Sequence, residues 1–185
     1  MYIFKLQEAQ IAIDEYLRKY PNSTVARKAR DGDCEAILEL YKRLRRGYDI
    51  EEGPSYDACM VVSEAASRKY TPAMIESAQD EMCVRAEFWP DGLVKLWEAY
   101  SLGDQNALII LQNAWHNCAR DIDSKYRSNE RLDKYEEFIL AFFYLHGIGT
   151  EKSDTLALRL FQSSAKHGCQ EARNMLVDLT NSNNK

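Results

Sequence analysis

The sequence lacks long apolar runs, closely spaced cysteines and a signal peptide. No stretch of its 185 residues approaches the roughly eighteen apolar residues that cross a membrane. The chain does not open with a basic segment followed by an apolar core and a small-residue cleavage site. We therefore expect a cytoplasmic protein, or one that reaches its site without a signal peptide. Five cysteines without a repeated spacing should be reduced thiols: Cys34, Cys59, Cys83, Cys118 and Cys169.

Residues that commonly carry out chemistry are scarce. None of the three histidines, His116, His146 and His167, is spaced to share a helix face with a second metal ligand. The sequence has no Gly-rich phosphate loop, nucleophile elbow or Cys-x-x-Cys motif. Adjacent carboxylates such as Glu136 and Glu137 diverge on a helix and are typical of a solvated face. We expect no enzyme activity, no catalytic residue, no cofactor and no metal.

The charge balance also restricts the class of partner. There are 29 acidic and 24 basic residues, which give a net charge of -5. Nucleic-acid binding needs a clustered positive surface, so nucleic acid is not the expected ligand. The basic clusters at 27–30 and 42–46 fall in the last turns of predicted helices, where cations complement the helix dipole. The composition favours a basic partner over an acidic one.

Eight glycines and four prolines are few, and each can be placed at the end of a predicted helix. Asp33, Thr71, Asp91, Asp104 and Asp154 stand at expected helix starts. No strand pattern competes. We expect a hydrophilic connection at 124–130, and helices at about 2–19, 23–31, 33–46, 56–69, 71–88, 91–102, 104–122, 131–146, 154–167 and 169–181.

Four stretches of the chain read alike, at 29–36, 66–73, 100–107 and 165–172. Each has a small or aromatic residue, a turn and a final alanine, and the final alanines are 37, 34 and 65 residues apart. This is a period near 34 with one copy missing, which is typical of stacked helix pairs. Gly32, Gly103 and Gly168 can adopt the left-handed conformation that ends one helix just before the next begins.

The C-terminal pair resembles the Sel-one-like repeat, a family of tetratricopeptide-like helical solenoids. The resemblance rests on a leucine and a small residue in the first helix, a tyrosine near its end, a Gly-x-Gly loop, and spaced small and aromatic residues after it. These positions are Leu140, Ala141, Tyr144, Gly147, Gly149, Asp154, Ala157, Phe161, Ala165, Gly168 and Ala172. Glu136 stands where the opening alanine is usual. An earlier copy has a longer loop at Gly47 to Ser55, and the middle copy is degenerate.

The resemblance implies an all-α, right-handed superhelix of about four degenerate Sel-one-like pairs. We expect an N-terminal capping helix at 1–22, a solenoid at 23–180 and a disordered tail at 181–185, together one structural domain. Members of the family generally act as adaptors or scaffolds, so the resemblance implies a non-catalytic protein-binding module. A small bacterial adaptor or a toxin immunity protein is favoured. The alternatives are an enzyme or small-ligand binder that uses the groove, and a self-assembling structural protein.

The repeat register separates candidate core residues from candidate contact residues. Core positions are Leu40, Leu44, Val62, Leu111, Trp115, Tyr144 and Phe161. Candidate protein-binding residues are Glu39, Arg43, Glu76, Asp80, Trp97, Phe142 and Phe143. For the four charged residues the alternative is a solvated helix face. Trp97 is either an exposed anchor or a core residue of the degenerate repeat, and core packing is the alternative for the two phenylalanines.

Overall fold

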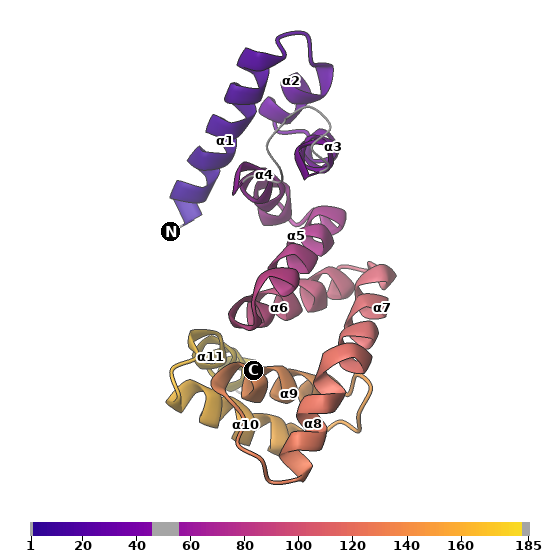
Figure 1. The fold of residues 1–185 in the computed structure, drawn as a ribbon, viewed down its shortest axis with the longest axis vertical. Coiled ribbons are helices and arrows are strands. Elements are labelled where there is room, and N and C mark those ends of the chain that lie inside the picture. Colours follow the sequence, from indigo (N-terminus) through magenta and orange to yellow (C-terminus); the bar gives the residue numbers. More distant parts are fainter. Residues whose placement is uncertain (1, 46–55, 183–185) are drawn as a thin grey trace. The chain divides into compact units, whose positions relative to one another are not determined.

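A computed structural model describes residues 2–45 and 56–182 of the chain. These residues form helices and contain no strand (Figure 1). The α-helices are α1 (Tyr2–Lys19), α2 (Thr24–Arg30), α3 (Cys34–Arg45), α4 (Tyr56–Ser67), α5 (Thr71–Val84), α6 (Trp89–Ser101), α7 (Gln105–Ala114), α8 (Arg120–Arg127), α9 (Lys134–His146), α10 (Asp154–Lys166) and α11 (Gln170–Ser182). Two short segments join them, the 3-10 helix η1 (Ala86–Phe88) and the π-helix η2 (Trp115–Ala119).

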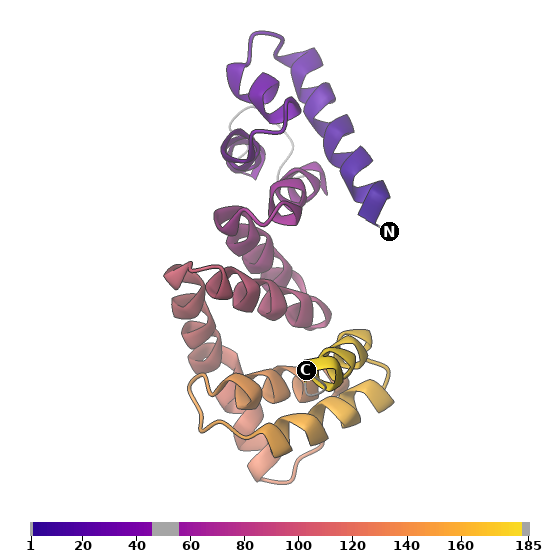
Figure 2. The same cartoon turned by 180° about the vertical axis from the view of Figure 1, so that it is seen from behind.

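The chain divides into two compact units, residues 1–80 and residues 81–185, with the boundary inside α5. In the first unit α3 packs against α2 and α4. In the second, α6 packs against α7, and α10 packs against α9 and α11. The pair α9 and α10 lies side by side in both ribbon views (Figure 1 and Figure 2). The prediction of an all-α protein built from consecutive helix pairs is confirmed. The predicted loop at Gly47 to Ser55 and residues 183–185 of the predicted tail lie outside the described residues.

The four related stretches form the same tight turn. Gly32, Gly103 and Gly168 have φ values of 91°, 103° and 94°, and Lys69 takes the equivalent place in the remaining copy with φ 62°. In each turn this residue and the next donate backbone hydrogen bonds to carbonyl groups of the preceding helix. The four final alanines are buried: Ala36, Ala73, Ala107 and Ala172. The repeat period therefore reflects a helix-ending turn followed by a close approach between helices.

A fifth turn of this kind follows α8, where the sequence pattern shows no copy. Asn129 has φ 61°, and the amides of Asn129 and Glu130 donate to the carbonyls of Tyr126 and Lys125. The expected connection at 124–130 is wrong in its first half, because α8 is helical to Arg127. Before α8, the π-helix η2 makes one wide turn, which changes which residues of the following turns face the core.

Several predicted helix boundaries are confirmed and others are corrected. The side chains of Asp33 and Asp104 accept backbone hydrogen bonds at the starts of α3 and α7, as expected of capping residues. Asp91 is not a cap, because α6 begins two residues earlier at Trp89. Ser153, not Asp154, caps α10 through its hydroxyl.

The core of the first unit is aliphatic and rich in alanine, whereas the core of the second is aromatic. Ala26, Ala29 and Ala65 lie in the first core with Ile37, Leu40 and Tyr41. In the second unit, Phe138 packs edge-on against Phe161, and Phe143 contacts Trp115 and Phe142. All the predicted core positions are buried, namely Leu40, Leu44, Val62, Leu111, Trp115, Tyr144 and Phe161.

Candidate functional site

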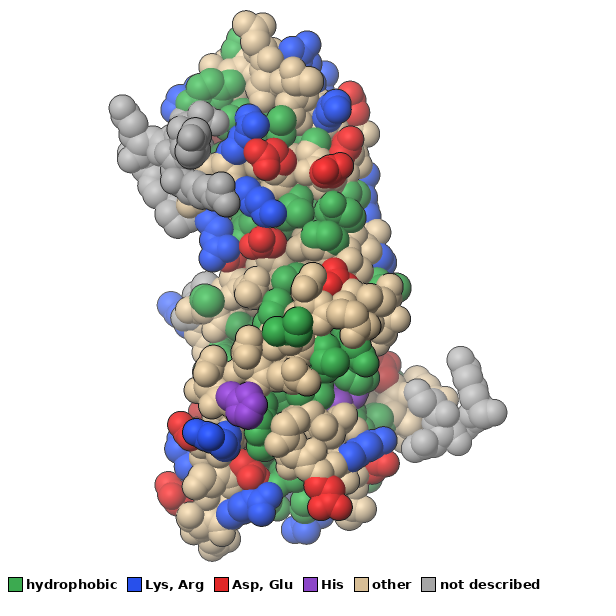
Figure 3. Space-filling view, turned by 90° about the vertical axis from the view of Figure 1, so that its right-hand side faces the viewer, with side chains coloured by type: hydrophobic (Ala, Val, Ile, Leu, Met, Phe, Trp, Pro, Cys, Tyr) green, Lys and Arg blue, Asp and Glu red, His purple; other side chains and the backbone are tan. Residues whose placement is uncertain are grey.

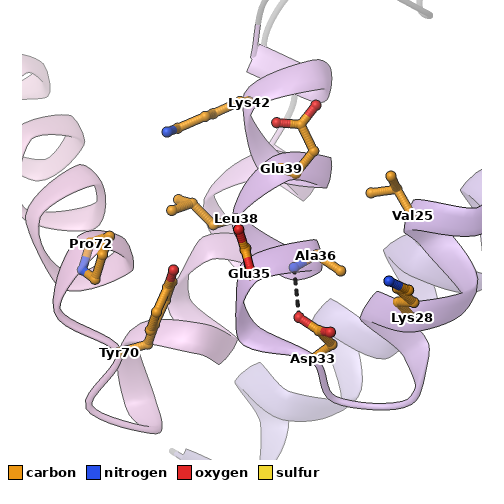
Figure 4. Close-up of a pocket in the computed structure, with 10 residues that line it drawn as sticks. All are labelled: Val25, Lys28, Asp33, Glu35, Ala36, Leu38, Glu39, Lys42, Tyr70 and Pro72. Carbon is orange, nitrogen blue, oxygen red and sulfur yellow. Dashed lines mark hydrogen bonds between the residues drawn. The ribbon is translucent and has the colours of Figure 1, made fainter.

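The candidate site is a groove of about 580 Å³ that crosses α3 in the first unit (Figure 4). One helix cap and two tight turns position its walls. Ser23 caps α2, the Gly32 turn leads directly into α3, and the Lys69 turn places the start of α5 beside them. The lining residues are Val25, Lys28, Asp33, Glu35, Ala36, Leu38, Glu39, Lys42, Tyr70 and Pro72.

The groove has an apolar floor. Ala36 and Leu38 are buried in α3, while Val25, Tyr70 and Pro72 are half-buried beside them. Figure 4 shows Val25 on one side of α3, and Tyr70 and Pro72 on the other. A half-buried aromatic ring next to a proline offers contact area at little cost in conformational entropy, because both side chains are already restricted. This combination is suited to contact with an apolar side chain of another molecule.

Charged side chains surround this floor, and they differ in how far they are neutralised. Glu39 pairs with Arg43 at 3.0 Å, and Lys42 lies 3.8 Å from Glu76. Lys28 and Glu35 have no ion-pair partner among the described residues. Within the part of the chain that the structure describes, the groove therefore presents one uncompensated cation, Lys28 on α2, and two carboxylates without an ion pair, Glu35 on α3 and Asp33 at the N-cap of that helix.

Acidic groups lie close to Tyr70. Burial raises the pKa of the Tyr70 hydroxyl above its ordinary value, and the charges of Glu35, Cys34 and Asp33 raise it further. No described residue forms a hydrogen bond with that hydroxyl. The Tyr70 ring and the carboxylates of Glu35 and Asp33 line the same groove.

The predicted acidic residues Glu76 and Asp80 belong to a network that ties α5 to α3. The hydroxyl of Tyr41 donates to Asp80 at 2.6 Å, and Arg45 lies 2.9 Å from Asp80 and 3.4 Å from Glu76. Burial is the main reason that the pKa of Tyr41 is raised, and its hydrogen bond to Asp80 adds to the effect. Lys42 and Arg45 therefore partly neutralise the acidic surface predicted on this helix, and its contact with a partner stays a prediction.

Acidic and basic side chains are interspersed on the face drawn in Figure 3. Glu39 and Arg43 bond to each other one helical turn apart, as in the solvated-face alternative. Glu39 nevertheless lines the groove, whereas Arg43 does not. Of the four charged candidates, Glu39 is the one in the groove.

The aromatic candidates lie in the second unit. Phe142 and Phe143 are 1% and 0% exposed, so they are core residues and not contact residues. Trp97 is half-buried, with its ring stacked on His146 at a centroid distance of 3.7 Å and edge-on to Phe142 at 6.4 Å. It is neither the free anchor nor the fully buried residue that the two alternatives describe.

The Nε2 atom of His146 is buried and has no hydrogen-bond partner among the described residues. Burial lowers the pKa of His146 to about 4, and the positive charge of Lys152 contributes. This imidazole is therefore neutral at pH 7, and its ring packs against Trp97 and Phe142 in an aromatic cluster.

Sequence reasoning did not identify most of the groove. Tyr70 could have been found from the alignment of the four turns, because the equivalent residues are Asp33, Asp104 and Cys169. An aromatic residue at a position filled elsewhere by small or polar residues is a specific signal. The positions of Lys28 and Lys42 in the last turns of helices explained both residues, and the sequence did not predict that they line a groove.

No metal site or disulfide is found in the described part of the chain. No group of three or more His, Cys, Asp and Glu side chains there could hold a metal ion. The five cysteines are free, with Cys169 buried and Cys59 and Cys83 exposed. None of the described helices is both long and apolar enough to span a membrane.

Comparison with known proteins gives one structural neighbour. No family model matches the chain, and no curated protein matches it. A solved structure of a protective antigen present in uropathogenic Escherichia coli strains is similar with a TM-score of 0.43 and 21% identity. That protein is described as displaying an SLR fold. The match covers 82% of this chain and 34% of the antigen, so the chain spans about a third of the antigen's length.

Proposed function

We propose that the chain is a non-catalytic protein-binding module that holds a partner polypeptide in the groove across α3. The supporting observation is the groove itself, which combines an apolar floor of Leu38, Tyr70 and Pro72 with charged groups that lack internal partners. Protein-recognition sites commonly have an apolar centre with an aromatic anchor and a polar rim. Helix-pair repeats present such surfaces as a consequence of their stacking.

The more specific form of the proposal is a small bacterial adaptor or inhibitor that works in the cytoplasm, such as a toxin immunity protein. The net charge of -5 supports it, because an acidic chain associates faster with a basic partner. An inhibitor and an adaptor differ in one measurable respect. An inhibitor abolishes its partner's activity at a one-to-one ratio, whereas an adaptor leaves that activity intact.

Site-specific photo-crosslinking tests the location of the binding site. A benzophenone amino acid replaces Lys28 in the groove, and in a second variant it replaces Glu151 in the other unit, which is also exposed. The tagged variants are irradiated in their native cytoplasm, and the products are identified by mass spectrometry. We expect one abundant product from position 28 and none of it from position 151. A product from position 151 alone, or none from either, contradicts the proposed site.

A further inference from the structure

The part of the groove nearest the start of α5 has the features of a site for a cationic side chain. Asp33 follows the Gly32 turn, Glu35 lies in the first turn of α3, and Tyr70 follows the Lys69 turn between α4 and α5. Figure 4 shows Tyr70 and Glu35 on the same side of α3. Glu35 is exposed and forms no ion pair with any residue that the structure describes. Asp33 uses one oxygen to cap α3 through the amide of Ala36 at 3.0 Å, and its negative charge remains.

The charges farther along the groove do not oppose a cation at this position. Of the two basic residues that line the groove, Lys42 is the one on the same side of α3, and Glu76 on α5 partly neutralises it at 3.8 Å. Arg68 donates to the carbonyl of Gly32 at 2.9 Å, and its charge is paired with Glu64. Lys28 stands on α2, across α3 from Tyr70 (Figure 4). The pKa of Tyr70 is raised because burial and the neighbouring carboxylates both disfavour a further negative charge at this position.

An apolar contact lies directly beside this acidic position. Leu38 follows Glu35 by one helical turn, and Pro72 stands next to Tyr70. A lysine or arginine stem packs well on such carbon surface while its charged group reaches a carboxylate. A guanidinium or ammonium group over a tyrosine face gains additional electrostatic attraction. An acidic or phosphorylated segment would instead meet the carboxylates of Glu35 and Asp33.

We propose that this groove recognises a basic peptide segment, in which a lysine or arginine stands next to an apolar residue. The cation lies on the Tyr70 ring against Glu35, and the apolar side chain rests on Leu38 and Pro72. This inference rests on the proposed function, because it names the partner chemistry for the same groove. Glu35→Gln and Tyr70→Leu are each expected to weaken binding about threefold to fivefold, as removal of one exposed charge pair or cation–π contact does.

Selection from a phage-displayed library of random twelve-residue peptides on the full chain tests the inference. Peptides that bind are then synthesised and measured by fluorescence polarisation against the wild type, Glu35→Lys and Tyr70→Leu. Glu151→Lys makes the same charge change at an exposed position in the other unit and is the matched control. Circular dichroism verifies that all variants fold. We expect the selected peptides to share a Lys or Arg beside an apolar residue, and Glu35→Lys to weaken them more than tenfold while Glu151→Lys does not.

The other outcomes separate this inference from the proposed function. Peptides without enrichment in Lys or Arg that still lose affinity in Tyr70→Leu overturn the basic segment but retain the groove as a binding site. Basic peptides that bind Glu35→Lys and Glu151→Lys equally well overturn the inference, because their attraction then comes from net charge alone. Failure to enrich any peptide also overturns it, and the photo-crosslinking result then decides the proposed function on its own.

Discussion

The loop at Gly147 to Gly149 packs closely against the π-helix η2, and a substitution at Gly149 tests this contact. Gly149 has φ 71°, and a Cβ built on it would come within 3.0 Å of the Trp115 indole, closer than real Cβ atoms approach their neighbours. Trp115 is 5% exposed and packs on Phe143, so its ring has little room to move. Gly149→Ala should therefore be strongly destabilising although Gly149 itself is at the surface.

The expected magnitude has two parts. A left-handed conformation costs a non-glycine residue about 1–2 kcal/mol. Inserting a methyl group into a filled space adds about 1–3 kcal/mol. Gly149→Ala should then lower the free energy of unfolding by about 2–5 kcal/mol. Gly168→Ala is the matched control, because Gly168 also has a positive φ of 94° but has nothing within 4 Å of its Cβ position, so it should lose only about 1–2 kcal/mol.

Urea denaturation followed by tryptophan fluorescence suits this comparison. All three tryptophans, Trp89, Trp97 and Trp115, lie in the second unit with both glycines, so the signal reports the unfolding of that unit. A third variant, Gly149→Ala in a Trp115→Ala background, removes every ring atom that the added methyl group would meet, so its loss relative to Trp115→Ala alone should be no larger than that of Gly168→Ala. Equal losses for Gly149→Ala and Gly168→Ala would refute the packing argument, as would a loss in the Trp115→Ala background as large as that in the wild type.

Three further predictions concern the turns, the core and pH. Lys69→Gly should be about 1 kcal/mol more stable than Lys69→Ala in chemical denaturation, because both lose the side chain but only glycine relieves the positive φ of 62°; equal stabilities would argue against that strain. Phe143→Ala should lose about 3–5 kcal/mol, whereas Phe88→Ala, at a side chain 39% exposed, should lose less than about 1.5 kcal/mol; similar losses would contradict the burial assigned to Phe143. The pKa of His146 in the folded state is lowered to about 4, below its usual value of about 6.5. The contribution of the neutral imidazole to the free energy of unfolding is therefore complete above pH 6.5 and is lost as the pH falls toward 4. This contribution is roughly 2 kcal/mol after allowance for partial exposure. In chemical denaturation, His146→Phe should flatten the dependence of stability on pH between pH 6.5 and 4. Parallel pH profiles for the two proteins would count against the neutral, stacked imidazole.

The candidate site was less predictable than the helices because it depends on which side chains are already neutralised. Glu76 and Asp80 occupy the register positions expected to face a partner, yet Arg45 and Tyr41 reach them from the neighbouring helix. Glu35 stands in the same repeat and has no such neighbour among the described residues. A sequence shows that both kinds of carboxylate exist. It does not show which cations are within reach.

The sequence alone determined the helical class, the positions of most helix ends and the repeated turn. These are local properties: a left-handed residue, a capping side chain and an apolar period each act within a few residues. The fifth turn at Asn129 escaped detection because asparagine replaces glycine and the flanking alanine pattern is missing. The extension of α8 to Arg127 was missed for a similar reason, since a π-helical turn shifts the apolar period that marks a helix.

Only the tertiary structure decided what those helices present to a partner. It placed Tyr70 and Pro72 beside Leu38, paired Lys42 with Glu76, and buried Phe142 and Phe143 in an aromatic core. Each of these results depends on contacts between residues far apart in the chain, and a side chain's exposure and charge balance are set by the helices packed around it. Local sequence fixes how each helix begins and ends, whereas the packing of neighbouring helices determines which of its faces remains open for binding.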